Sequence, residues 1–184
     1  MANVNTKAYV LHRDRFTCRF CGTRLFLSQA IKVLDWKETS LGLWDLHGKK
    51  EPLRSRWATV DHIVSEAEGG LDTLENLAAC CVTCNSRKGG TTAQPSIVAS
   101  ETGAWDGLSG LFLGLAEEFA ARLSSEDQKW RKALTREGVV PVTTGLEAVL
   151  AALRRAKEEG IRAFDDTPIR LQFRRKGRKE KDEE

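Results

Sequence analysis

The 184-residue sequence lacks a long hydrophobic run and a secretion signal. No apolar stretch approaches the ~20 residues that a membrane-spanning helix needs. The first residues, MANVNTKAYVLHRD, do not place a charged segment ahead of an apolar one, as a signal peptide does. We therefore expect a cytoplasmic protein with no membrane partner. Neither a repeat array nor disorder is indicated, and 41% hydrophobic residues in a chain of this length allow one core, or a small core plus an appendage.

Strong net charge is also lacking. The formal charge of +3 does not by itself identify a nucleic-acid-binding protein. Residues 1–90 carry 13 Lys and Arg against 10 Asp and Glu, and residues 91–184 carry 16 against 16. Neither half is therefore a basic module. One local exception is the stretch 170–181, where seven cations stand against a single acid.

The five cysteines do not fit a disulfide framework, because thiols stay reduced in the compartment that we expect. Cys18 and Cys21 form one C-x-x-C pair, and Cys81 and Cys84 form another. Two such pairs can place four thiolates tetrahedrally around one Zn²⁺ ion, which we favour over buried free cysteines. Cys80 competes with Cys81, but only Cys81 has the two-residue spacing to Cys84. We interpret Cys80 as a small apolar core residue.

Hydrophobic periodicity predicts a mixed first half. A helix is expected over 4–14, and a short helix near Ser28 within a poorly patterned region, 23–57, that we interpret as an insertion. The following elements are a strand Ala58–Ile63, a loop Glu66–Glu75, a strand Leu77–Cys80 and a helix from Asn85 onward. This order predicts a unit of strand, loop, strand and helix.

The second half is predicted to be helical after a linker rich in Thr, Ser, Ala and Gly. One apolar stripe comprises Leu108, Leu111, Phe112, Leu115, Phe119 and Leu123. Capping boxes are expected at Ser125 with Gln128 and at Thr144 with Glu147. Gly138 and Gly160 stand where helices commonly end, and the last helix is expected at about 146–159, followed by an extended segment, Ile169–Phe173. The predicted domains are 1–92, a linker 93–104, and a helical region 105–184 with the basic tail.

Chemically distinct residues follow one another in order from Asp61. They are Asp61-His62-Ile63, Gly69-Gly70, Asn76-Leu77, Cys81-x-x-Cys84-Asn85 and Lys88-Gly89. This order resembles the HNH endonuclease family, in its branch with two cysteine pairs, over roughly residues 7–92. The resemblance implies an α+β fold, in which a ββα-metal nuclease core with zinc-binding knuckles precedes the helical C-terminal region. Some family members carry a further histidine ligand where Gly89 stands here.

The resemblance also implies roles for individual residues. Phosphodiester hydrolysis needs a base for the attacking water and a cation for the charge that grows on the phosphate. His62 matches the general base, and histidine, with a free pKa of about 6.5, is mostly neutral at cellular pH. Asp61 and Asn85 match the metal ligands, and their oxygens favour Mg²⁺ or Mn²⁺. Asn76 matches the catalytic-motif amide that ties the loop and orients the base.

The implied function is a metal-dependent endonuclease that hydrolyses phosphodiester bonds in DNA. The alternative is a non-cleaving, zinc-stabilised DNA-binding or scaffold module of a larger assembly. Nucleic-acid contacts are expected from Arg87, Lys88 and the tail residues Arg174, Arg175 and Lys176, although such a tail is equally consistent with a solvated run. A homodimer or a protein partner of the C-terminal helices stays open. The five tryptophans are expected to pack rather than to stack on bases.

Overall fold

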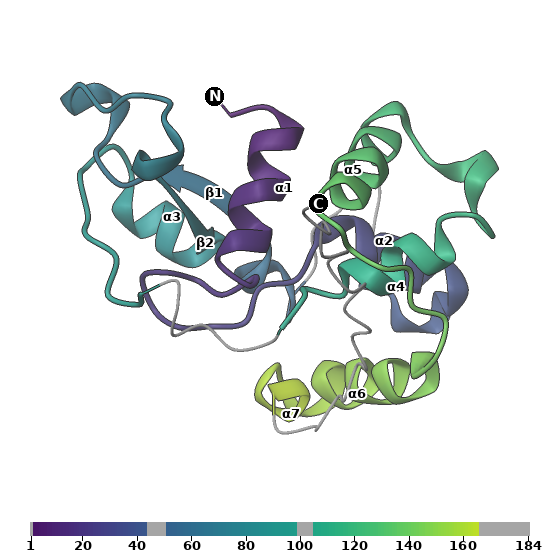
Figure 1. Ribbon diagram of the computed structural model, residues 1–184. Coiled ribbons are helices and arrows are strands. Elements are labelled where there is room, and N and C mark those ends of the chain that lie inside the picture. The colour runs from purple at the N-terminus through teal and green to yellow at the C-terminus, as the bar shows by residue number, and fades with distance from the viewer. Residues whose placement is uncertain (1, 44–50, 99–104, 166–184) are drawn as a thin grey trace, which may run out of the picture.

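A computed structural model describes residues 2–43, 51–98 and 105–165. Within these ranges the chain is an α+β protein with one two-stranded antiparallel sheet, which confirms the predicted fold class. In Figure 1 helix α1 stands between two groups of elements: the sheet with α3 on one side, and α2, α4 and α5 on the other. The extended segment Ile169–Phe173 and the basic tail with Arg174, Arg175 and Lys176 lie outside the described residues.

Helix α1, Val4–Arg13, begins where the Asn3 side chain accepts a hydrogen bond from the backbone N–H of Thr6. The helix buries Ala8, Val10 and Leu11. It packs against both strands of the sheet and against helix α5, Ser125–Arg136. The helix expected over 4–14 is therefore confirmed, and it packs between the ββα unit and the helical part of the molecule.

The ββα unit follows the predicted order. Strand β1, Ala58–His62, pairs antiparallel with β2, Leu77–Cys81, so that Asp61 lies opposite Ala78 and His62 opposite Leu77. Helix α3, Val82–Lys88, begins three residues before the expected Asn85, because the Cys81 side chain already accepts the N–H of Cys84 at the helix start. All of β2 is buried, whereas all of β1 is half-buried. Strand β1 therefore has side chains available to solvent or a ligand.

The helical part contains four further helices among the described residues: α2 Ser28–Lys37, α4 Ser109–Leu115, α6 Leu146–Glu159 and α7 Arg162–Asp165. Helix α2 packs on α4. Phe26, just before α2, contacts the rings of Trp105 and Phe164 edge to face. Residues from the stretch interpreted as an insertion thus belong to the core. Short 3₁₀ turns connect these elements: Thr39–Leu41, Arg54–Arg56, Glu66–Glu68, Leu74–Asn76 and Ala120–Arg122.

Three local predictions in the helical part were wrong. The apolar stripe does not continue on one helix, because α4 ends at Leu115 and the chain turns, although Phe119 and Leu123 still pack against the core. The first capping box is formed by Ser124 and Asp127, since the carboxylate of Asp127 reaches back to the N–H of Ser124 at 2.8 Å. No such box begins α6, because Gly145 occupies its N-cap position in a left-handed conformation. The predicted helix ends at Gly138 and Gly160 are confirmed.

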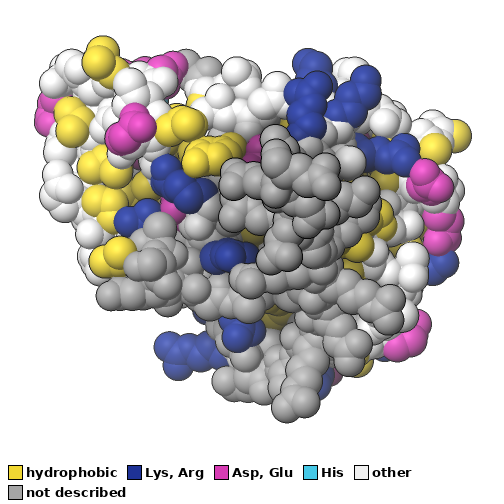
Figure 2. All heavy atoms as spheres, viewed as in Figure 1, with side chains coloured by type: hydrophobic (Ala, Val, Ile, Leu, Met, Phe, Trp, Pro, Cys, Tyr) yellow, Lys and Arg dark blue, Asp and Glu magenta, His cyan; other side chains and the backbone are white. Residues whose placement is uncertain are grey.

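The hydrophobic core is continuous across the described chain. It includes residues from the predicted domain 1–92 and from the predicted region 105–184, and the division between these parts stays a prediction. Trp57, Trp105 and Trp130 are buried in it, as expected for packing residues. On the face drawn in Figure 2, Lys and Arg side chains are scattered among hydrophobic and acidic ones. No helix within the described ranges is both long and apolar enough to cross a bilayer.

Candidate active site and metal centre

Four cysteine sulfurs gather at one point of the fold. Cys18 and Cys21 come from the loop after α1, Cys81 ends β2, and Cys84 lies in the first turn of α3. All four Sγ atoms lie within 4.8 Å of one another, and the sulfurs of Cys21 and Cys81 are 4.0 Å apart. Tetrahedral zinc with bonds of about 2.3 Å separates its sulfurs by ~3.8 Å. The donor set and its spacing are therefore compatible with a structural zinc ion.

The fold brings these thiols together through the backbone and a buried carboxylate. The N–H of Gly22 donates to the carbonyl of Cys18 at 2.8 Å, which closes the first knuckle. Asp14, fully buried, accepts hydrogen bonds from the side chains of Arg13 and Arg19 and from the N–H of Ala79. The end of α1, the first knuckle and β2 are thereby joined. Charge-assisted bonds of this kind are roughly twice as strong as neutral ones.

Cys80 is not part of this cluster. It is fully buried, and its sulfur lies 3.0 Å from the hydroxyl oxygen of Thr59 across the sheet. Burial raises the pKa of its thiol to about 12. The pKa of the Cys18 thiol is also raised to about 12, first by a hydrogen bond with Cys81 and then by burial. A coordinated thiol, by contrast, is deprotonated outright, so the cluster suits a cation that supplies the compensating charge.

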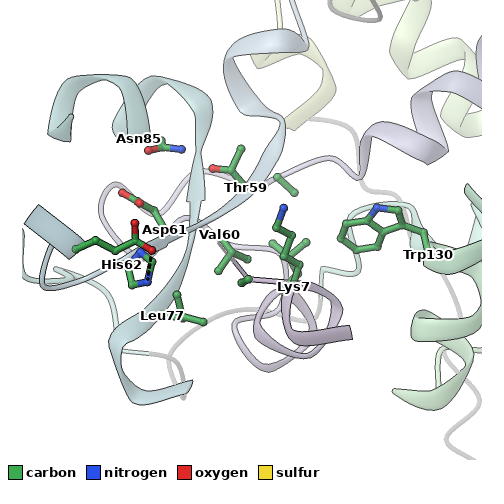
Figure 3. Close-up of a pocket in the computed structure, with 12 residues that line it drawn as sticks. Lys7, Thr59, Val60, Asp61, His62, Leu77, Asn85 and Trp130 are labelled. Atoms are coloured by element: carbon green, nitrogen blue, oxygen red, sulfur yellow. Dashed lines mark ion pairs between the residues drawn. The ribbon is translucent and has the colours of Figure 1, made fainter. Parts of the chain in front are cut away.

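A cavity of about 580 Å³ lies beside β1. Asp61, His62 and Asn85, three residues that the sequence placed in one site, line it together (Figure 3). Asp61 and His62 are adjacent at the end of β1, and Asn85 comes from α3. The roles of the three residues stay predictions, but their common location agrees with them.

His62 is held by a carboxylate that sequence reasoning did not find. Its Nε2 lies 2.6 Å from Oδ1 of Asp72 and 3.6 Å from Oε1 of Glu66, and its side chain is 12% exposed. The pKa of Asp72 is lowered, chiefly by the hydrogen bond from His62, so this carboxylate is ionised at neutral pH and accepts the bond. The shared proton then resides on Nε2, which leaves the lone pair on Nδ1. Asp72 thus orients the ring and selects its tautomer.

Asn76 ties the loop between the strands. Its Oδ1 accepts the N–H of Val64 at 2.8 Å, and its Nδ2 donates to the carbonyls of Val64 and Leu71. Gly70 lies against the same carbonyl, because a Cβ added there would stand 1.9 Å from the oxygen of Val64. Asp72 is two residues further along this loop. The amide therefore fixes the segment that carries the partner of His62, consistent with the predicted loop-tying role.

Asp61 offers an oxygen suited to a cation. Among the described residues its Oδ2 is buried and has no hydrogen-bond partner. The ammonium of Lys88 lies 3.0 Å away as an ion pair, but without hydrogen-bonding geometry. A carboxylate oxygen and the Asn85 amide lining one cavity form a hard donor set of the kind that Mg²⁺ or Mn²⁺ takes. These residues fit the catalytic ion that the sequence implies.

The predicted phosphate contacts differ in their surroundings. Arg87 is exposed on α3. The Lys88 side chain is only 5% exposed and faces Asp61, so it would have to leave this carboxylate to reach DNA. Both contacts stay predictions. Sequence reasoning missed Asp72 and Glu66 because their approach to His62 depends on how the loop folds back, and the spacing of acidic residues along this loop gave no signal for it.

Comparison with known proteins matches part of the chain to a protein family. The model of the HNH endonuclease family matches residues 48–91, which are 44 of the 184 residues. The match includes β1, β2, α3 and the second cysteine pair, whereas α1 and the first pair lie before it. No curated protein and no solved structure matches the chain. Residues 48–91 are thus similar in sequence to the HNH endonuclease family, and this similarity suggests a nuclease or nucleic-acid-binding function.

Proposed function

We propose that this protein is a metal-dependent endonuclease that hydrolyses phosphodiester bonds in DNA. The observation that carries the proposal is the cavity that Asp61, His62 and Asn85 line together, with His62 held by Asp72 at 2.6 Å. A hydrolytic site needs a base and a cation site beside one phosphate. The three residues provide both within a single cavity. The match to the HNH endonuclease family over residues 48–91 supports the same reading.

His62 acts as the general base in this proposal. Its Nε2–H donates to the ionised Asp72, so Nδ1 is free to take a proton from water. As the imidazole becomes positively charged, the neighbouring Asp72 and Glu66 stabilise the charge. Orientation by a carboxylate keeps the ring in one tautomer and one position, which is the usual function of the third member in such arrangements. Asp72 is therefore a positioning residue.

Asp61 and Asn85 would hold the divalent ion, Mg²⁺ or Mn²⁺. When bound, such an ion supplies positive charge to the phosphate and to the departing oxygen. Lys88 lies 3.0 Å from Asp61 and is almost fully buried, so it already compensates this carboxylate. The Cys18, Cys21, Cys81 and Cys84 cluster, with a structural Zn²⁺, would fix the start of α3 and thus Asn85, one residue beyond Cys84.

The ion pair between Lys88 and Asp61 also favours the alternative function. A lysine ammonium beside a carboxylate neutralises it without any metal. A protein that keeps this pair permanently would be a zinc-stabilised DNA-binding or scaffold module that does not cleave. In the nuclease a divalent ion displaces the ammonium from Asp61 and DNA is cleaved, whereas in the non-cleaving module the ion pair persists.

The test is nicking or linearisation of supercoiled plasmid with and without Mg²⁺ or Mn²⁺. His62→Ala should lower the cleavage rate by roughly 10² to 10⁴ while DNA binding and zinc content stay unchanged. His12→Ala is the matched control, because His12 is half-buried on α1 and does not line the cavity. Asp72→Asn should lower the rate less than His62→Ala. Cleavage at the wild-type rate by His62→Ala would refute the proposed base, and no cleavage by the wild type with either metal would favour the non-cleaving module.

A further inference from the structure

The cavity extends well beyond the residues proposed for chemistry. Every residue of β1, from Ala58 to His62, lines it. Four steps along a strand of ~3.3 Å each give a length of about 13 Å. In Figure 3 the end opposite His62 is bordered by Lys7 and Trp130. The cavity therefore has room for a part of the substrate next to the reacting phosphate.

Lys7 brings a cation to this end. It lies on the same face of α1 as Leu11, one turn later, and both residues line the cavity. Lys7 is half-buried, and within the part of the chain that the structure describes its side chain makes no ion pair or hydrogen bond. Lys88, the other lysine close to the site, is already paired with Asp61. Lys7 is thus a cation beside the cavity whose charge no carboxylate of the described chain compensates.

Trp130 forms the far wall. It lies on α5, and its indole ring is directed toward Lys7 (Figure 3). The residue is 8% exposed, so only a small part of it is accessible to a ligand. A cation for the backbone beside an aromatic for a base is the combination by which proteins bind single-stranded nucleic acid. In Figure 3 Lys7 lies between the catalytic candidates and Trp130, so a strand that extends from the catalytic candidates meets the cation before the aromatic residue.

We propose that this part of the cavity binds a single-stranded nucleotide adjoining the phosphate to be cleaved, with Lys7 on a backbone phosphate and Trp130 against the base. The inference rests on the proposed function and deepens it by naming the substrate class. About 580 Å³ is the size of a site for a small organic ligand. A nucleotide from one strand fits into such a volume, and the combination of a cation with an aromatic residue is typical of single-strand binding. The preferred DNA is therefore single-stranded or opened beside the cut.

Binding without cleavage tests the inference. The probe is a fluorescein-labelled oligothymidylate of about ten nucleotides, compared with a hairpin duplex of similar length, by fluorescence anisotropy with no divalent metal added. Lys7→Met keeps the aliphatic stem and removes the charge. It should weaken binding of the single strand roughly tenfold, as expected for one charge-assisted hydrogen bond. It should also reduce the salt slope by about 0.7 log unit, the value for one phosphate contact on a single strand. Affinity for the duplex should change less than twofold.

Lys129→Met is the matched control, because Lys129 lies on the same helix as Trp130, is 66% exposed and does not line the cavity. Equal effects of the two variants would overturn the inference, as would an equal loss of duplex binding by Lys7→Met. The result is separable from the plasmid test. If the wild type does not cleave but Lys7→Met lowers the affinity for the single strand, the nuclease proposal is refuted and this binding site is retained. A nuclease whose affinity is independent of Lys7 would retain the catalytic proposal and lose this one.

Discussion

The adjacent cysteines at the end of β2 provide the sharpest test of the metal centre. The Cys81 sulfur lies 4.0 Å from that of Cys21 inside the four-cysteine cluster. Cys80, one residue earlier, instead places its sulfur 3.0 Å from the Thr59 hydroxyl. The two residues are both buried and share a strand, so the same substitution to serine probes two different surroundings. We expect Cys81→Ser to affect zinc and Cys80→Ser to spare it.

The magnitudes follow from what each sulfur contacts. Structural zinc contributes an apparent ~10 to 16 kcal/mol in small zinc modules, or about 2.5 to 4 kcal/mol for each of four thiolates if shared evenly. Cys81→Ser should therefore lower the melting temperature by about 5 to 15 °C for a chain of this size. Serine at position 80 keeps a hydroxyl beside Thr59 and should cost about 1 kcal/mol, or roughly 2 to 4 °C.

The assay pairs metal analysis of purified protein with thermal unfolding. The wild type and Cys80→Ser should carry about one zinc per chain. Cys81→Ser should carry clearly less, and its melting temperature should no longer respond to a strong zinc chelator. Wild-type protein without zinc would refute the metal centre. Zinc lost from Cys80→Ser and kept in Cys81→Ser would show that the wrong cysteine had been assigned as a ligand.

Two further predictions concern the loop and the helical part. Gly70→Ala should reduce plasmid cleavage at least tenfold, because the added Cβ would stand 1.9 Å from the Val64 oxygen and displace the loop that carries Asp72. Gly90→Ala is the control, because a Cβ at that position meets no atom within 4 Å. Equal cleavage rates in the two variants would contradict the argument. Asp127, despite the opposing effect of burial, has a lowered pKa through hydrogen bonds from Lys32 and Ser124. A carboxyl group whose pKa is lowered by folding stabilises the folded state at pH values above its usual pKa of 3.8, and this stabilisation is lost as the pH falls further. Denaturant unfolding should therefore give Asp127→Asn a lower free energy of unfolding than the wild type at pH 7, and this difference should shrink toward pH 3. A difference that stays constant with pH would argue against the ionised carboxylate.

The elements that the sequence predicted well are those whose signals are local. The two short strands β1 and β2 and the apolar spacing of α6 each depend on a few neighbouring residues. Helix ends were less predictable, because competing caps differ by one residue. Ser124 and Ser125 both match a capping pattern, and the choice depends on which carboxylate can turn back to the chain. Such a choice is geometric and is not encoded in composition.

The same distinction holds for the site. The order of Asp61, His62, Asn76 and Asn85 is a linear pattern, and a chain of this order could be recognised without a structure. The contacts of Asp72 with His62 and of Lys88 with Asp61 depend on loop and helix geometry. Lys7 and Trp130 meet at one cavity although 123 positions separate them in the sequence. No periodicity brings these two together, since their proximity follows from the packing of α1 on α5.

The buried carboxylate of Asp14 bears on which fragments of this protein can fold by themselves. The segment matched by the HNH endonuclease family begins at residue 48, yet Asp14 receives the N–H of Ala79 from within it. Two of the four clustered cysteines also precede that segment. If residues 48–91 were expressed alone, the backbone N–H of Ala79 would lack its acceptor, and Cys81 and Cys84 would lack the other two cysteines of the cluster. The smallest autonomous unit is therefore expected to extend back at least to Asp14, at the end of α1.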